Sequence, residues 1–159
     1  MHPAPPGASP ALYVLLVFVH IFTTMVAAGL NASYVIWIMR GTKNPASLLF
    51  ALRGVKFIDD YLANPCYLVG GLTGVLMILM GKAVASYLWV AIGLYVLAMA
   101  IAYGVYTPLL SRQIKTLDAL GPDHPEYRML ARRSNQVGAA MGILVVIIVA
   151  LKIFEPPLW

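Results

Sequence analysis

Chemically active side chains are scarce in the long apolar stretches of this sequence, and His20 is the clearest of them. It lies within LYVLLVFVHIFTTMVAAGLNASYVIW, which runs from Leu12 to Trp37 and is almost entirely apolar. Ionisable residues are costly in an apolar environment and often mark functional sites. An imidazole at this position therefore predicts either a cofactor ligand or a hydrogen bond that ties two helices together.

The composition indicates that these apolar stretches span a membrane. Of the 159 residues, 61% are hydrophobic and 11% charged, whereas a soluble domain has about 45–50% apolar and about 25% charged residues. Four stretches reach the roughly 20 apolar residues of a membrane helix, and we place them at about 11–39, 65–80, 86–110 and 134–154. Because backbone groups in lipid must be paired within their own element, the sequence predicts an all-α fold, an integral membrane four-helix up-down bundle.

Two further segments flank these spans. Residues 1–10 are rich in proline, and we expect a loose extracytoplasmic tail, followed by one transmembrane domain over 11–159. Residues 45–60 are amphipathic and form either a helix in the cytoplasmic interface or an extension of the second span. Asp59 and Asp60 lie at its end, where we expect them to form exposed pairs with nearby basic residues.

The positive charges are distributed unevenly between the connections. The first and third connections hold nine of the eleven basic residues: Arg40, Lys43, Arg53, Lys56, Arg112, Lys115, Arg128, Arg132 and Arg133. The other two are Lys82 and Lys152. By the positive-inside rule the nine face the cytoplasm, which places both termini outside. These basic loops suit anionic lipid, and we expect no nucleic-acid partner.

Other side chains with ligand chemistry are expected near His20. His20 lies about nine residues, or roughly 14 Å at 1.5 Å per residue, from the outer end of the first span. Antiparallel second and third spans would bring Met77, Met80 and Tyr95 to similar depth. Histidine and methionine are axial ligands of many haem irons, and they are also soft ligands that suit Cu(I).

Three hypotheses follow from this arrangement. In the first, His20 binds one haem b for electron transfer or redox chemistry, with Met77 or Tyr95 nearby. In the second, His20, Met77 and Met80 handle copper, with His2 outside the membrane. In the third, the protein is a cofactor-free structural or accessory subunit of a membrane complex, and His20 hydrogen-bonds to a carbonyl, threonine or tyrosine of another helix. The sequence contains no HExxH, CxxC or phosphate-loop motif, so no reaction is assigned.

Small residues are spaced for close helix packing. Gly70 and Gly74 form one GxxxG motif, and Gly138 and Gly142 form another. Such motifs let helices approach closely where no hydrophobic effect drives their association. They serve either packing within the bundle or a homodimer.

Four strings together resemble a known family. VHIFTTMVAAG in the first span, NPCYLVGGLTG in the second, YLWVAIGLYVLA in the third and IVALKIFEPP in the fourth are similar, in order and spacing, to an uncharacterised family of predicted bacterial integral membrane proteins. The resemblance covers nearly the whole chain. It implies four spans and a bacterial inner membrane, and it carries no assigned activity.

The first-span pattern is more distantly similar to two other membrane families. These are the haem-containing protoporphyrinogen oxidases and the copper-resistance D domain. In the oxidases the first-span histidine ligates haem, and this role maps to His20. That family usually has a lysine shortly before its histidine, whereas here Val17, Phe18 and Val19 precede it. The resemblance therefore implies a ligand without implying the oxidase reaction.

Overall fold

The computed structural model describes residue 5, residues 9–81 and residues 83–157, and the regular elements of that part are all helical. They are α1 (Pro10–Lys43), α2 (Pro45–Ile58), η1 (Asp59–Ala63), α3 (Asn64–Leu79), α4 (Ser86–Ile101), η2 (Ala102–Tyr106), α5 (Thr107–Leu120) and α6 (Pro125–Phe154). Because consecutive elements join without a break, they make four rods that are long and apolar enough to cross a membrane. The predicted all-α membrane fold is confirmed. The predicted tail over 1–10 falls largely outside the described residues.

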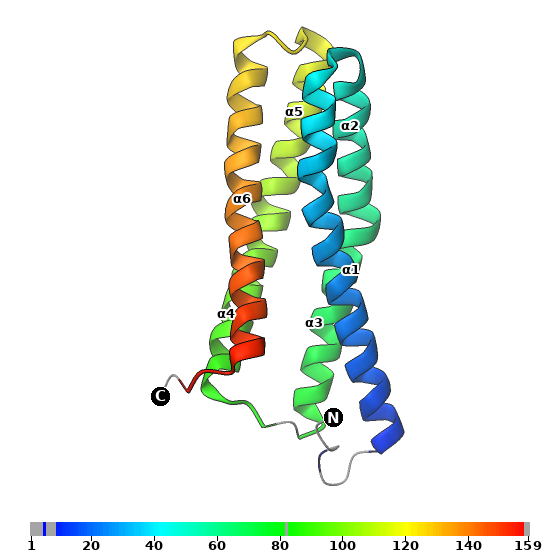
Figure 1. Cartoon of the computed structure of the whole chain (residues 1–159), viewed down its shortest axis with the longest axis vertical. Coiled ribbons are helices and arrows are strands. Elements are labelled where there is room, and N and C mark those ends of the chain that lie inside the picture. Colours follow the sequence, from blue (N-terminus) through cyan, green and yellow to red (C-terminus); the bar gives the residue numbers. More distant parts are fainter. Residues whose placement is uncertain (1–4, 6–8, 82, 158–159) are drawn as a thin grey trace.

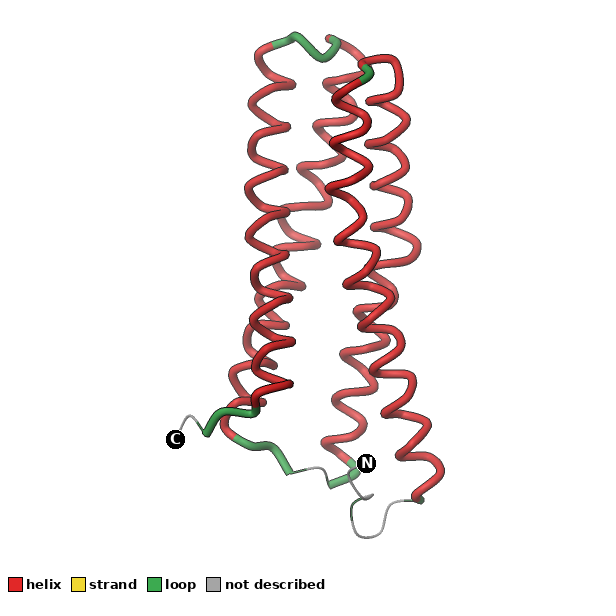
Figure 2. The backbone as a smooth tube through the Cα atoms, viewed as in Figure 1, coloured by secondary structure: helices red, strands yellow, loops and turns green. Residues whose placement is uncertain are grey.

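The four rods form two groups. One contains α1, which packs against α2 and α3, and the other contains α6, which packs against α4 and α5. The groups meet where α2 contacts α5, at the end that holds the α1–α2 and α5–α6 connections; we call this the basic end. At the opposite end, α1 with α3 stands apart from α4 with α6 (Figure 1, Figure 2).

The turns at the basic end are specified by individual residues. Asn44 ends α1 and also caps α2, because its side chain accepts a hydrogen bond from the Ala46 N–H at 3.2 Å. A Cβ on Gly41 would lie 2.8 Å from the Ala51 Cβ, so glycine is what lets α1 and α2 approach so closely. Gly121 ends α5 with φ of 81°, a conformation that favours glycine.

Two π-helical segments interrupt the second and third rods at equivalent places. Each segment comes just before a proline: η1 precedes Pro65, and η2 precedes Pro108. Proline has no N–H, and its ring clashes with the carbonyl four residues earlier, so a wider π turn lets the helix continue past it. As a result, the amphipathic region 45–60 runs through η1 into α3 as one rod.

The hydrophobic core lies toward the basic end. It contains nine buried residues: Tyr34, Leu48, Leu52, Val55, Ala63, Tyr106, Leu110, Leu117 and Tyr127. Toward the opposite end, large apolar side chains face outward. Leu72 is 64% exposed and Val146 67%. An apolar outer surface of this kind suits lipid as the surrounding medium.

Candidate functional site

A cavity of about 430 Å³ separates the two helix pairs at the opposite end of the bundle. We call it the His20 cavity. Its walls are largely apolar and come from α1, α3, α4 and α6, and they include His20, Gly71, Gly74, Met77, Ala91, Tyr95 and Lys152. It therefore lies at the depth where the sequence placed the ligand candidates. Small-molecule sites have this character, with volumes of about 300–1,000 Å³ and few polar groups.

His20 is held in a fixed orientation on the α1 wall of this cavity. Its Nδ1 lies 2.7 Å from the carbonyl oxygen of Gly70 and 3.4 Å from the hydroxyl of Thr73. Since a carbonyl can only accept, Nδ1 carries a proton and donates it to Gly70, so in the neutral form of the ring the lone pair is on Nε2. Gly74 makes room for the ring, because a Cβ there would lie 3.3 Å from His20 Cε1.

The structure brings two of the other predicted ligands to this cavity. Met77 is 4% exposed and lines the α3 wall. Tyr95 lies on the α4 wall, and its hydroxyl donates to the carbonyl oxygen of Tyr67 at 3.0 Å. Met80 is the residue after α3 and is not among the described residues that line the cavity.

Of the basic side chains expected at the end of the bundle that holds the His20 cavity, the structure describes Lys152. Lys152 lines the His20 cavity, where its ammonium group lies 2.6 Å from the Glu155 carboxylate and 5.5 Å from the centre of the Tyr87 ring. Lys82 and His2 lie outside the described residues. Within residues 9–81 and 83–157, no three His, Cys, Asp or Glu side chains gather as a metal-binding group.

Glycines shape the α3 walls of the site. A Cβ on Gly71 would lie 2.2 Å from the Tyr95 hydroxyl, and a Cβ on Gly70 would lie 2.6 Å from Thr24 Cγ2. The first GxxxG motif, Gly70 and Gly74, therefore faces α1 within the same chain. In the second motif, a Cβ on Gly138 would lie 3.5 Å from the Tyr106 ring, whereas a Cβ on Gly142 would meet nothing within 4 Å.

A second cavity of about 380 Å³ continues toward the basic end. We call it the Asn31 cavity. Tyr95 and Ile148 line both cavities. Asn31 donates from Nδ2 to the Tyr67 hydroxyl at 3.1 Å, while its Oδ1 is buried and has no hydrogen-bond partner among the described residues. Asn64 lines the same cavity and connects it to the next feature.

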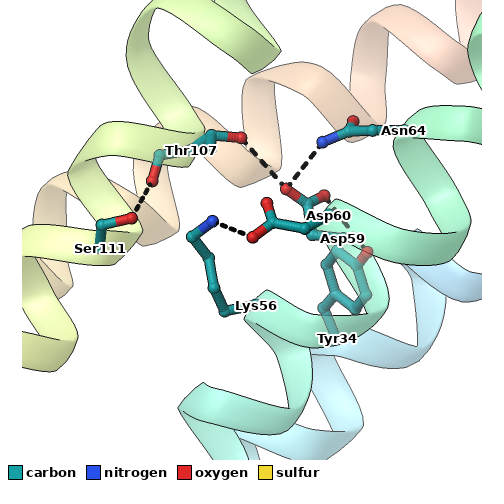
Figure 3. A network of polar contacts seen from close by, with 7 residues as sticks. All are labelled: Tyr34, Lys56, Asp59, Asp60, Asn64, Thr107 and Ser111. Carbon is teal, nitrogen blue, oxygen red and sulfur yellow. Dashed lines mark hydrogen bonds and ion pairs between the residues drawn. The ribbon is translucent and has the colours of Figure 1, made fainter.

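Asp59, the first residue of η1, is buried against Thr107, the residue that follows η2. It is only 4% exposed and has three hydrogen-bond partners: the Tyr34 hydroxyl at 3.3 Å, Asn64 Nδ2 at 3.1 Å and the Thr107 hydroxyl at 3.2 Å (Figure 3). The expected ion pair forms at Asp60, which pairs with Lys56, although both side chains are only partly exposed, and the expectation is wrong for Asp59.

The sequence did contain a signal for this buried carboxyl group. Leu52 and Val55 are fully buried on the core face of α2, and Asp59 follows Val55 at the four-residue spacing of one helix face. The signal was missed because residues 45–60 were treated as a segment near the membrane surface, where a carboxylate needs no special environment.

Comparison with known proteins identifies a family and no activity. A family model described as "Predicted integral membrane protein (DUF2269)" matches residues 14–156. Searches of curated proteins and of solved structures find no match. The more distant resemblance to haem- and copper-linked families therefore stays a prediction, supported so far by residue pattern alone.

Proposed function

We propose, for a chain that belongs to the DUF2269 family of predicted integral membrane proteins, that the His20 cavity binds one haem b through His20. The observation that carries the proposal is the 2.7 Å hydrogen bond from His20 Nδ1 to Gly70, made at the wall of a largely apolar cavity. Ligating histidines usually donate their second ring N–H to a carbonyl or carboxylate, which fixes the ring and raises its basicity. His20 has this arrangement.

The cavity walls suit a flat apolar group. Gly71, Gly74 and Ala91 are small and lie on facing walls, from α3 and from α4. The charged edge of such a group would lie toward Lys152, whose ammonium group would then interact with that edge as well as with the Glu155 carboxylate. With such a group bound, the small residues would exclude water from its apolar body, and Lys152 would lie near its charged edge.

Of the two candidates for a second ligand, Met77 is favoured. Met77 is buried and lies three residues from Gly74, the residue against which His20 packs. Tyr95 already donates its hydroxyl proton to Tyr67, and it would have to break that bond to approach an iron. Bound haem would supply one-electron redox chemistry, with a potential set by its axial ligands and by its buried surroundings.

The test is an absorption spectrum of the purified protein, oxidised and then reduced with dithionite. Cells supplied with a haem precursor should give protein with a Soret band. His20→Ala should lose the band, while His124→Ala should keep it, because His124 lies in the α5–α6 connection. Met77→Leu should retain haem with a shifted spectrum, and Met129→Leu, which changes a 48% exposed methionine, should leave it unchanged. A Soret band that survives unchanged in folded His20→Ala would overturn the proposal.

One other function has a specific observation in its favour. The His20–Gly70 hydrogen bond joins α1 to α3, so a cofactor-free structural or accessory subunit would also need it. In that case the wild type is colourless and His20→Ala unfolds more readily.

Copper handling through His20 and Met77 is the third outcome, and metal analysis of the colourless protein distinguishes it from a purely structural role.

We also propose that the protein lies in a bacterial inner membrane with its basic end in the cytoplasm, where the nine basic residues would face anionic lipid. In a Cys66→Ala background, a membrane-impermeant thiol reagent added to intact cells should label Pro157→Cys and not Ala119→Cys. These positions are exposed at opposite ends of the bundle. The reverse labelling pattern would invert the proposed orientation.

A further inference from the structure

Asp59 lies at a depth where a charge is poorly tolerated. Its partner Tyr34 is six residues, or about 9 Å along α1, beyond Arg40 toward the middle of the bundle. Around this level the outer surface is apolar: Phe57 is 59% exposed and Val105 47%. Asp59 is therefore an ionisable group inside the apolar layer, a position that is usually functional.

No cation of the described residues pairs with the ionised form of Asp59. Among the ion pairs of the described residues, Lys56 binds Asp60 and none includes Asp59. The Lys56–Asp60 pair is neutral as a whole. The titratable groups that act on Asp59 are otherwise tyrosines, neutral near pH 7: Tyr34 from α1, Tyr67 from α3, and Tyr103 and Tyr106 from η2. A buried carboxylate without a cation is costly, and such groups tend to bind a proton.

The partners of Asp59 can accommodate both protonation states. One hydroxyl lies at each carboxyl oxygen, that of Tyr34 at Oδ1 and that of Thr107 at Oδ2. A hydroxyl donates to a carboxylate, and after a rotation about its C–O bond it accepts from a carboxylic acid. Asp59 can thus gain or lose a proton while the backbone stays in place.

Asp59 also lies between two environments. On one side of Asp59 is the Lys56–Asp60 ion pair, with side chains 19% and 33% exposed, and Lys56 lies three residues nearer to the basic end than Asp59. Toward the middle of the bundle it contacts Asn64, which lines the Asn31 cavity. Figure 3 shows Asp59 between the Lys56–Asp60 pair and Asn64. One side of Asp59 therefore faces the ion pair that leads toward the basic end, and the other faces the Asn31 cavity in the middle of the bundle.

We propose that Asp59 is a reversible proton-binding site that connects the basic end of the protein with the Asn31 cavity. A proton from water is passed by way of Asp60 to the Asp59 carboxylate and forms the neutral carboxylic acid. Release in the other direction returns the carboxylate. The π-helical segments η1 and η2 hold the two halves of this site, since Asp59 begins η1 and Thr107 directly follows η2. This site is independent of any group bound near His20.

The test is infrared spectroscopy of the full chain in lipid, across a pH series around 7. Aspartate in water has a pKa of about 3.9, so surface carboxyl groups are ionised there. The wild type should show the C=O band of a carboxylic acid, shifted in D₂O and lost as pH rises. Asp59→Asn should lack this band, and Asp118→Asn, the control at a 55% exposed carboxylate, should retain it. A folded wild type without a band that depends on Asp59 would refute the proposal.

A second pair of variants keeps the test decisive if Asp59→Asn does not fold. Tyr34→Phe and Thr107→Val each remove one hydroxyl from the carboxyl group. Each should shift the C=O band to higher wavenumber, because it loses a hydrogen-bond partner. A band that has the wild-type position in both variants would assign the proton to another residue and overturn the proposal.

Discussion

The basic end of the bundle and its opposite end are held together by different forces. The basic end contains the buried core around Leu52 and Leu110, whereas the opposite end contains the His20 cavity between its helix pairs, from which the Asn31 cavity continues toward the middle of the bundle. Helix α1 has 34 residues, about 51 Å at 1.5 Å per residue, while the apolar layer of a bilayer is about 30 Å thick. Part of the bundle therefore extends into water, and only there does the hydrophobic effect drive a core together.

Within the membrane, shape and hydrogen bonds must replace that driving force. Helix α1 approaches α3 at Gly70 and Gly74, and His20 bonds across the same contact. The pair α4 and α6 contacts α3 here through Tyr95, which bonds to Tyr67, and the His20 cavity lies between the two pairs. The comparison teaches that the part of the bundle with the weaker core leaves an apolar space between its helices, which is where we propose that a group binds.

The largest predicted effect is in the core at the basic end. Leu52→Ala removes a fully buried side chain from α2, and a change of this kind costs about 2–5 kcal/mol. Leu72→Ala, at a position that is 64% exposed in the membrane part, should cost far less. Denaturant unfolding in detergent measures both free energies. Equal losses would remove the distinction between the two ends.

The next effect is at the wall between the two cavities. Gly71→Ala places a Cβ 2.2 Å from the Tyr95 hydroxyl, so Tyr95 must move and its bond to Tyr67 should break. We expect a loss of about 1–3 kcal/mol together with weaker ligand binding in the His20 cavity. Gly93→Ala, which meets nothing within 4 Å, should be neutral or gain up to about 1 kcal/mol from helix propensity. Thermal unfolding of the two variants compares them directly, and identical midpoints would contradict this packing.

A smaller effect is expected from the polar contact in the Asn31 cavity. Tyr67→Phe removes the hydroxyl that accepts from Asn31. Interhelical hydrogen bonds in membranes contribute on average about 0.6 kcal/mol, and we expect a loss of that size. Tyr61→Phe, at a position that is 68% exposed, is the matched control. Chemical unfolding of both variants tests this, and a loss above about 2 kcal/mol would mean that Tyr67 has a further role.

The smallest effect is expected at the surface of the basic end. Arg53 and Asp118 form an ion pair at 3.0 Å with side chains 57% and 55% exposed. Arg53→Ala should change the free energy of unfolding by less than about 1 kcal/mol, and the difference should shrink further in high salt. A double-mutant cycle with Asp118→Ala isolates the pair. A coupling that is large and independent of salt would contradict its exposure.

The all-α membrane fold was predictable because it follows from local properties. Long apolar runs and the pairing of backbone groups in lipid leave helices as the solution. The meeting of His20, Met77 and Tyr95 at one cavity was also within reach, since antiparallel spans place equal depths side by side. The burial of Asp59 was not predicted, because it depends on a contact between η1 and Thr107, which follows η2 on a different rod. Such a contact between distant segments leaves only an indirect trace in the sequence.

The central claim is that the weaker end of the bundle holds a bound group at His20. Native mass spectrometry of the wild type, released from detergent after expression with a haem precursor, measures this directly. The account predicts the mass of the chain plus one haem, and the mass of the bare chain for folded His20→Ala. A bare chain mass for the wild type, under conditions that retain bound lipid, would contradict it.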